Sequence, residues 1–212
     1  MSKLSDLRKE YSKESLDIAE VKSNPIEQFK HWFEECINAE LSEPNAMVIS
    51  TSLNNVPESR VVLLKEFNDN GFVFYTNYLS HKGNQINQNN QVALNFLWLE
   101  LERQVRINGI AEKLDDRTND EYFYSRPKMS QIGAIVSNQS EIIPDRTYLE
   151  NKLEKATELY ETNPIIRPEH WGGYIVKPYK IEFWQGRPSR LHDRLLYVLN
   201  DNNQWKIERM SP

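Results

Sequence analysis

The residues best suited to chemistry lie close together near residue 190. Residues 180–194 read KIEFWQGRPSRLHDR and bring Arg190, His192 and Arg194 within five positions. Alternate side chains of an extended segment share one face, so we expect these three groups to project together. Such a set of potential cations suits an anionic, planar ligand better than it suits a hydrophobic core.

A second set of polar side chains has helical spacing. Tyr122, Arg126 and Ser130 recur every four residues, which predicts one face of a helix. A guanidinium supplies charge and a bidentate fork, and a phenol and a hydroxyl add neutral donors, so the set could hold a phosphate. The spacing alone favours the alternative, an ordinary polar helix face.

Isolated basic residues elsewhere could complete an anion site. Arg60 and Lys65 bracket an apolar strand, and Lys82 follows Ser80, which can cap a helix. Anions are favoured near a helix N-terminus by the free amides and the helix dipole. Both ends of an arbitrary strand usually lie in solvent, and the residues alone leave that interpretation of Arg60 and Lys65 open.

Taken together, these stretches resemble the pyridoxine/pyridoxamine 5′-phosphate oxidase family. The signature of that family, roughly Glu-Phe-Trp-Gln, a few variable residues and Arg-Leu-His-Asp-Arg, is matched at every fixed position of residues 182–194. Its Tyr-Phe-x-Ser-Arg-Pro-x-x-Ser-Gln-Ile-Gly element is matched at residues 122–133 and Arg-x-Val-Leu-Leu-Lys at residues 60–65. Six such blocks follow in the family's order from about residue 7 to the end.

The resemblance implies a fold and an activity. The implied fold is α+β, an antiparallel FMN-binding split β-barrel with flanking helices, working as a homodimer with the flavin at the subunit interface. The implied reaction oxidises pyridoxine 5′-phosphate and pyridoxamine 5′-phosphate to pyridoxal 5′-phosphate, with FMN as cofactor, oxygen as electron acceptor and hydrogen peroxide as product. The alternatives are a non-catalytic split-barrel protein that binds FMN or pyridoxal phosphate, and a reductase-like flavin barrel with other substrates.

The resemblance also assigns roles residue by residue. Arg190 and His192 would be catalytic and hold the substrate ring against the flavin, and whether either is a general base stays open. The other substrate-binding residues would be Arg8 and Tyr11 in a lid and Lys65, Tyr122, Arg126 and Ser130 at the phosphate. The cofactor-binding residues would be Arg60, Val61, Val62, Leu63, Leu64, Lys65, Tyr75, Thr76, His81, Lys82, Gln104, Gln139, Ser140, Trp184 and Arg194. His81 stands where members often carry Arg, and a neutral imidazole there would weaken FMN retention.

Hydrophobic periodicity supplies the elements that must position these groups. Residues 1–22 are charged and weakly patterned, which predicts a mobile arm, and residues 23–212 form one domain. A helix starts at Asn24-Pro25 with an apolar stripe of Ile26, Phe29, Phe33 and Ile37 widened by Trp32 and Cys36. Strands are predicted at residues 46–53, 60–67, 72–77, 92–99, 103–114, 171–176, 180–185, 195–199 and 205–209. Further helices are predicted at about 81–90, 115–125 and 146–161, and Pro127 interrupts the second of these before one or two more helical turns through residue 135.

Composition excludes several other classes. The net charge of −5 and the scattered cations argue against a nucleic-acid binder. No apolar run approaches the roughly 20 residues of a membrane span, and the polar N-terminus lacks the apolar stretch of a signal peptide. The single cysteine excludes an internal disulfide and favours the cytoplasm, and four histidines and one cysteine show no metal-ligand spacing.

Overall fold

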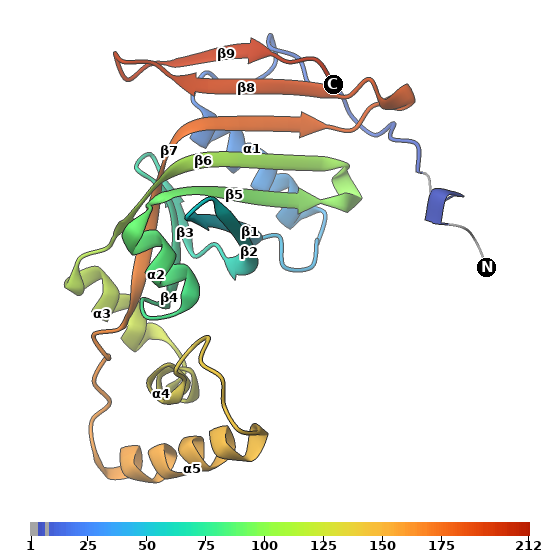
Figure 1. Cartoon of the computed structure of the whole chain (residues 1–212). Helices are drawn as coiled ribbons and strands as arrows, with labels where there is room; N and C mark the ends of the chain where they lie inside the picture. The colour runs from blue at the N-terminus through green and yellow to red at the C-terminus, as the bar shows by residue number, and fades with distance from the viewer. Residues whose placement is uncertain (1–3, 7–8) are drawn as a thin grey trace.

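Two long strands carry the fold (Figure 1). The computed structural model describes residues 4–6 and 9–212. Strand β6 (Arg103–Lys113) alternates buried and more exposed residues. The longer strand β7 (Trp171–Gln185) runs antiparallel to it and pairs with the full length of β6. All other strands are added to this pair, so the ends of β7 define two ends of the molecule.

The nine strands form one antiparallel sheet that curls into an open barrel. Its order is β2-β1-β5-β6-β7-β4-β3, with β8 added to β7 and β9 to β8. The strands are β1 (Ala46–Leu53), β2 (Val56–Leu63), β3 (Glu66–Asn68), β4 (Gly71–Asn77), β5 (Gln91–Trp98), β8 (Asp193–Leu199) and β9 (Trp205–Arg209). The sheet does not close on itself, which confirms the predicted split barrel.

A bulge divides β7 between two sets of neighbours. The register with β6 shifts between Asn108 and Gly109, and this leaves Tyr179 unpaired on β7. The first part of β7 pairs with β4 and the last part pairs with β8. The sequence predicted two strands here; they form one, because Pro178 lies at the bulge, where a missing amide donor is tolerated.

The predicted strand at residues 60–67 is wrong in its continuity. Leu64 and Lys65 connect β2 to β3 and belong to neither strand. The Leu64 amide donates to the Asn45 carbonyl, and the Lys65 amide donates to the Val73 carbonyl. The chain therefore crosses from the edge at β1 to β4 at this point. The hairpin β3–β4 turns at Gly71, whose φ of 141° is one that other residues rarely adopt.

Helix α1 (Pro25–Asn38) covers the barrel and completes its core. Asn24 caps it as predicted, since its side-chain oxygen accepts the Ile26 amide at 2.8 Å. Phe29 is fully buried and meets aromatic rings from three strands, namely Phe67, Phe72 and Phe96. The predicted stripe is wrong at one end: Ile37 is 55% exposed, because the buried line runs through positions 29, 32 and 36.

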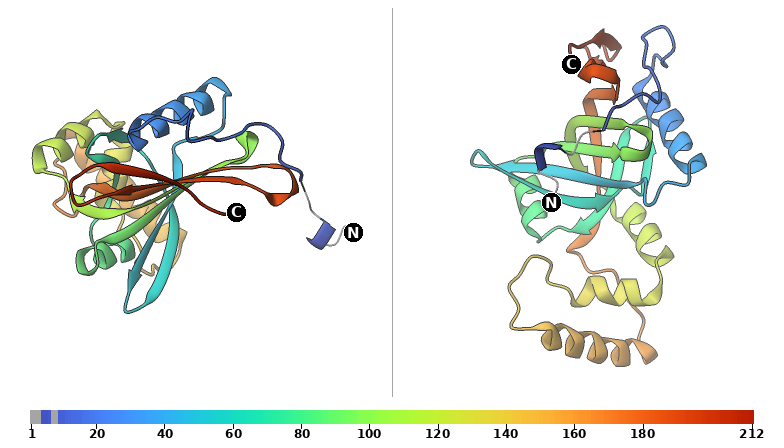
Figure 2. Two further views of the ribbon diagram at one scale, coloured as in Figure 1. Left: turned by 90° about the horizontal axis from the view of Figure 1, so that it is seen from above. Right: turned by 90° about the vertical axis from the view of Figure 1, so that its right-hand side faces the viewer.

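The remaining helices surround one end of the sheet. They are α2 (His81–Gln88), α3 (Asp116–Ser125), α4 (Lys128–Val136) and α5 (Arg146–Thr162), with 3₁₀ turns at Leu4–Asp6, Leu99–Leu101 and Pro188–Arg190. Ser80 caps α2 as predicted. Figure 1 shows α4 and α5 together, away from the sheet, and α5 buries no residue fully. Figure 2 shows the β1–β2 hairpin extending beyond the barrel. Within residues 4–6 and 9–212 no helix is long and apolar enough to cross a membrane.

Candidate active site

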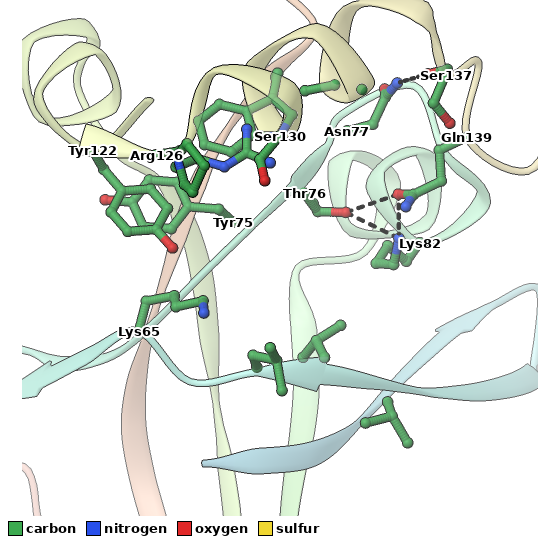
Figure 3. Close-up of a pocket in the computed structure, with 17 residues that line it drawn as sticks. Lys65, Tyr75, Thr76, Asn77, Lys82, Tyr122, Arg126, Ser130, Ser137 and Gln139 are labelled. Atoms are coloured by element: carbon green, nitrogen blue, oxygen red, sulfur yellow. Dashed lines mark hydrogen bonds between the residues drawn. The ribbon is translucent and has the colours of Figure 1, made fainter. Parts of the chain in front are cut away.

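A cavity of about 710 Å³ opens where β2 and β4 face α2, α3 and α4. Figure 3 shows the polar side chains that line it. The lining includes eleven of the residues that the sequence singled out: Val61, Val62, Leu63, Lys65, Tyr75, Thr76, Lys82, Tyr122, Arg126, Ser130 and Gln139. Segments from residue 61 to residue 139 therefore converge here, as the resemblance implied.

Lys82 is a buried cation on one side of this cavity. Its ammonium donates to Thr76 Oγ1 at 2.9 Å, Ser80 Oγ at 3.2 Å and Gln139 Oε1 at 2.7 Å, all neutral acceptors. In the described part of the chain no carboxylate pairs with it. Burial, and then the charge of Arg60, lower the pKa of Lys82 to about 8. An anion bound beside it would supply the missing countercharge.

Arg126 lies on the opposite side of the cavity from Lys82 (Figure 3). Its guanidinium stacks over the Trp171 ring at 4.6 Å, and its Nη1 is buried without a hydrogen-bond partner among residues 4–6 and 9–212. Burial lowers the pKa of Arg126. Because buried donors are nearly always paired and Arg126 lines the cavity, this guanidinium favours an acceptor supplied by a ligand.

Stacked aromatic rings stand beside Arg126. Tyr75 and Tyr122 are 3.9 Å apart between ring centroids, and Tyr75 and Trp171 are 5.4 Å apart. Burial raises the pKa of Tyr75 to about 12, so its hydroxyl stays protonated at neutral pH. The cavity thus combines two separate cationic groups with an aromatic wall, which suits planar ligands that carry phosphates.

The predicted helical face of Tyr122, Arg126 and Ser130 is wrong, although all three line the cavity. Helix α3 ends at Ser125, and Arg126 has an extended backbone with ψ of 152°. A new helix then starts after Pro127. The residue before a proline avoids the helical region, so the chain turns between the two helices and aims Arg126 at the cavity.

Four of the predicted cofactor residues surround the cavity without lining it. Arg60 donates to Thr51 Oγ1 at 2.5 Å, Gln85 Oε1 at 3.3 Å and Glu58 Oε2 at 3.0 Å. Leu64 is in the hydrophobic core, and His81 is exposed at the start of α2. Ser140 accepts the His81 amide at 3.3 Å and lines an adjacent cavity.

The other predicted residues lie at the far end of β7. Trp184 is 4.6 Å from His192 and 5.8 Å from Tyr11 between ring centroids. Arg190, His192 and Tyr11 line a second cavity of about 610 Å³, and Gln104 lies near Trp184. Arg8 is outside the described residues. Figure 1 shows that this end of β7 is remote from α4, beside which the first cavity lies.

The prediction that Arg190, His192 and Arg194 share one extended face is wrong. Ser189 and Arg190 have positive φ values of 57° and 61°, so the segment turns instead of extending. Arg194 belongs to β8, where its Nε donates to Glu182 Oε1 at 2.7 Å. This ion pair and hydrogen bond raise the pKa of Arg194. Of these three residues, Arg190 and His192 line the second cavity and Arg194 does not.

His192 is held in one neutral tautomer. The Arg187 backbone amide donates to His192 Nδ1 at 3.1 Å, so a neutral ring carries its proton on Nε2. Partial burial, followed by the charge of Arg190, lowers the pKa of His192. At neutral pH the ring is therefore a hydrogen-bond donor through Nε2.

Sequence reasoning missed several residues at these two cavities. Trp171 under Arg126, and Gln85 between Arg60 and Thr51, had no motif to mark them. Glu182 was part of the matched signature, yet its role as the partner of Arg194 and Arg106 was not predicted. A carboxylate between apolar neighbours, Ile181 and Phe183, was the available signal.

The fold and the first cavity define a class: a split β-barrel protein with a cationic, aromatic-lined cavity whose chemistry suits phosphorylated ligands. Residues 33–160 match the family model described as pyridoxamine 5′-phosphate oxidase, and residues 171–212 match the pyridoxine 5′-phosphate oxidase C-terminal dimerisation region. The chain belongs to the pyridoxamine 5′-phosphate oxidase family, a family of flavin oxidoreductases.

Individual relatives agree with this family. The pyridoxine/pyridoxamine 5′-phosphate oxidase of Trichormus variabilis is 55% identical over 210 residues, which cover 99% of this chain and 98% of the relative. The crystal structure of PhzG from Burkholderia lata, in complex with tetrahydrophenazine-1-carboxylic acid, has a TM-score of 0.88 and 28% identity, covering 95% of this chain and 100% of that one. A related FMN-binding protein from Nostoc punctiforme shares the fold, with a TM-score of 0.68 and 17% identity over 87% of this chain and 95% of its own.

Proposed function

We propose that this chain is a pyridoxine/pyridoxamine 5′-phosphate oxidase that uses FMN and molecular oxygen. The observation that carries the proposal is the pair of cationic groups in one cavity, one at Lys82 and one at Arg126 (Figure 3). Two phosphorylated molecules, a cofactor and a substrate, would each satisfy one group. The single cysteine leaves no internal disulfide, which fits a cytoplasmic enzyme.

The Lys82 group fits the phosphate of FMN. The buried ammonium lacks a countercharge, and Lys82 lies in the first turn of α2, where the helix dipole favours anions. Arg60, 3.3 Å from Gln85, stands close enough to lower the pKa of Lys82 and would add a second positive charge. When bound, FMN would supply the two-electron redox chemistry, and the protein would supply binding and orientation.

The Arg126 group fits the phosphate of the substrate. Arg126 would give a charged donor through its guanidinium, and Lys65, Tyr122 and Ser130 would add donors from the neighbouring lining. This phosphate is remote from the carbon that is oxidised, so the group acts by positioning the substrate. Oxidation of the alcohol or amine carbon passes two electrons to oxygen and yields hydrogen peroxide, and the amine substrate also releases ammonia after hydrolysis.

A complete site would need two copies of the chain. Trp171 at the start of β7 lines the first cavity, whereas Trp184 near its end contacts His192, which lines the second cavity with Arg190. The strand path between them is roughly 40 Å at about 3.3 Å per residue. We propose that the partner subunit of a homodimer brings its Arg190 and His192 loop to the first cavity, with the flavin at the interface. The match of residues 171–212 to a dimerisation region supports this arrangement.

In that complex, Arg190 and His192 would act on the substrate ring. His192 would donate a hydrogen bond from Nε2 to an oxygen of the substrate and would not accept the substrate's proton there. Arg190 would stabilise negative charge that develops on the ring. Trp184 and Gln104 would contact the flavin from the same end of β7, and Arg194 would support this wall through Glu182.

The direct test is aerobic turnover of pyridoxine 5′-phosphate by purified protein supplemented with FMN. We expect pyridoxal 5′-phosphate and hydrogen peroxide to form in equal amounts. Bound yellow flavin without product would instead indicate the non-catalytic binder. A second test mixes inactive Lys82→Met and Arg190→Met subunits after dissociation. Random pairing should restore about a quarter of wild-type activity, because half of the dimers then hold one intact site; no recovery would refute a shared site.

A further inference from the structure

Glu102 is a buried carboxylate that is not among the predicted substrate- or cofactor-binding residues of either cavity. It follows the 3₁₀ turn after β5, is 3% exposed, and has a left-handed backbone with φ of 57°. One oxygen accepts the backbone amides of Ser12 at 2.9 Å and Lys13 at 3.2 Å, and Lys9 Nζ is 3.6 Å from the other. A buried charge is costly unless paired, and among the described residues its partners come from residues 9–13.

This anchor fixes the position of Tyr11. The Tyr11 ring lies directly over Gly186, where an added Cβ would come within 2.7 Å of Tyr11 Cγ. The ring meets Trp184 and His192 edge-on, each at 5.8 Å between centroids. The Gly186 amide in turn donates to the Glu102 carbonyl at 2.8 Å. Glu102 thus holds both the segment with Tyr11 and the backbone on which Tyr11 rests.

The residues after Tyr11 have an independent anchor. The Leu16 amide donates to Asp193 Oδ2 at 3.1 Å, and the Leu16 carbonyl accepts from Arg209 Nη2 at 3.0 Å. The Leu16 side chain is 4% exposed in the core, and Arg187 Nη1 donates to the Glu14 carbonyl at 3.0 Å. Loss of Glu102 should therefore free residues 9–13 while residues 14–17 stay in place.

We propose that Glu102 is a positioning residue, which fixes residues 9–13 so that Tyr11 forms a wall of the Arg190–His192 cavity. The kinetic part of this proposal rests on the proposed function, whereas the positioning of residues 9–13 does not. If Tyr11 closes over the substrate ring, its ordered position contributes to substrate binding before the reaction, and this is a KM effect. A flexible segment would pay the ordering entropy at each binding event.

The test compares Glu102→Ala with Glu100→Ala, an exposed glutamate two residues earlier, and with the conservative Glu102→Gln. Hydrogen exchange of the Ser12 and Lys13 amides, and trypsin cleavage after Lys9 and Lys13, are measured without substrate. We expect at least tenfold faster exchange and cleavage in Glu102→Ala, no change in Glu100→Ala, and an intermediate result in Glu102→Gln, because a neutral oxygen accepts weaker hydrogen bonds. Equal protection in Glu102→Ala and wild type would overturn the proposal.

Kinetics then show whether Glu102 acts through Tyr11. We expect Glu102→Ala to raise the KM for pyridoxine 5′-phosphate about tenfold with kcat within about twofold, and the double variant with Tyr11→Ala to be no worse than Tyr11→Ala alone. Additive effects would overturn the proposed route. If Glu102→Ala does not fold, Ser12→Pro removes one donor from the exposed segment and must give the same exchange result at Lys13. Lack of turnover by wild type would count against the proposed function alone, since exchange needs no substrate.

Discussion

Replacement of Lys82 by Met tests whether the first cavity is built for an anion. Burial and Arg60 lower the pKa of Lys82 from 10.5 to about 8. Holding the ammonium there at neutral pH therefore costs on the order of 3 kcal/mol, less what its hydrogen bonds to Thr76, Ser80 and Gln139 return. Methionine has a similar shape and no charge, so we expect Lys82→Met without flavin to be as stable as wild type or more stable at pH 7.

The pH dependence gives the sharper magnitude. Lys82 keeps an ordinary pKa in the unfolded chain, so between pH 8 and 10.5 the unfolded state binds more protons than the folded state. The stability of wild type therefore rises with pH in this window, and the penalty is fully present below it. Relative to Lys82→Met, wild type should gain about 2 kcal/mol between about pH 7 and pH 9.5.

The assay is urea unfolding of flavin-free protein at both pH values, at one protein concentration, followed by tryptophan fluorescence. Other titrating groups cancel in the difference between the two proteins. Saturating FMN should abolish the rise of wild-type stability with pH that is due to Lys82, because a bound phosphate keeps Lys82 protonated. Lys82→Met should bind FMN weakly. If the free energy of unfolding changes with pH by the same amount, within about 0.5 kcal/mol, in both flavin-free proteins, the reasoning about Lys82 is wrong.

Four further predictions follow from the site and the core. Arg126→Met removes the unpaired guanidinium, and steady-state kinetics should show KM for pyridoxine 5′-phosphate raised about 100-fold with a smaller change in kcat. Arg190→Met should lower kcat at least about 100-fold while absorbance shows flavin still bound, and unchanged turnover would remove Arg190 from the active site. His81→Arg adds a charge at the first position of α2, and titration should show FMN bound about fivefold more tightly. Phe29→Ala empties the centre of the core and should cost about 3–5 kcal/mol in urea unfolding, and a loss below about 1 kcal/mol would contradict its packing.

Local patterns predicted the elements well and their long-range connections poorly. Alternation located β1 to the residue, and Ser80 and Asn24 marked the starts of their helices because a cap is a local interaction. The break at Leu64 and Lys65 depends on partners at Asn45 and Val73, which no local pattern contains. The bulge opposite Gly109 likewise depends on the pairing of distant strands.

The same contrast holds for the site. The resemblance brought together residues that periodicity could not, such as Lys65, Lys82 and Gln139, and the structure places all three on one cavity. Spacing arguments failed where backbone conformation changes within a few residues, at Pro127 and at Ser189–Arg190. Pro127 indicated a break in the helix. The positive φ values of Ser189 and Arg190 could not be predicted, because neither residue is a glycine.

Several local costs in this chain lie at the two ends of β7. Lys82 and Arg126 keep charge or donors buried without full compensation at one end, and Glu102, Ser189 and Arg190 hold left-handed backbones at the other. Such costs persist only where the surrounding fold, or something bound, repays them. Ligands that bind only the folded state stabilise it by mass action, so phosphates at one end and a second subunit at the other would offset these costs together. Binding of these partners would therefore compensate part of the local cost at both ends of β7.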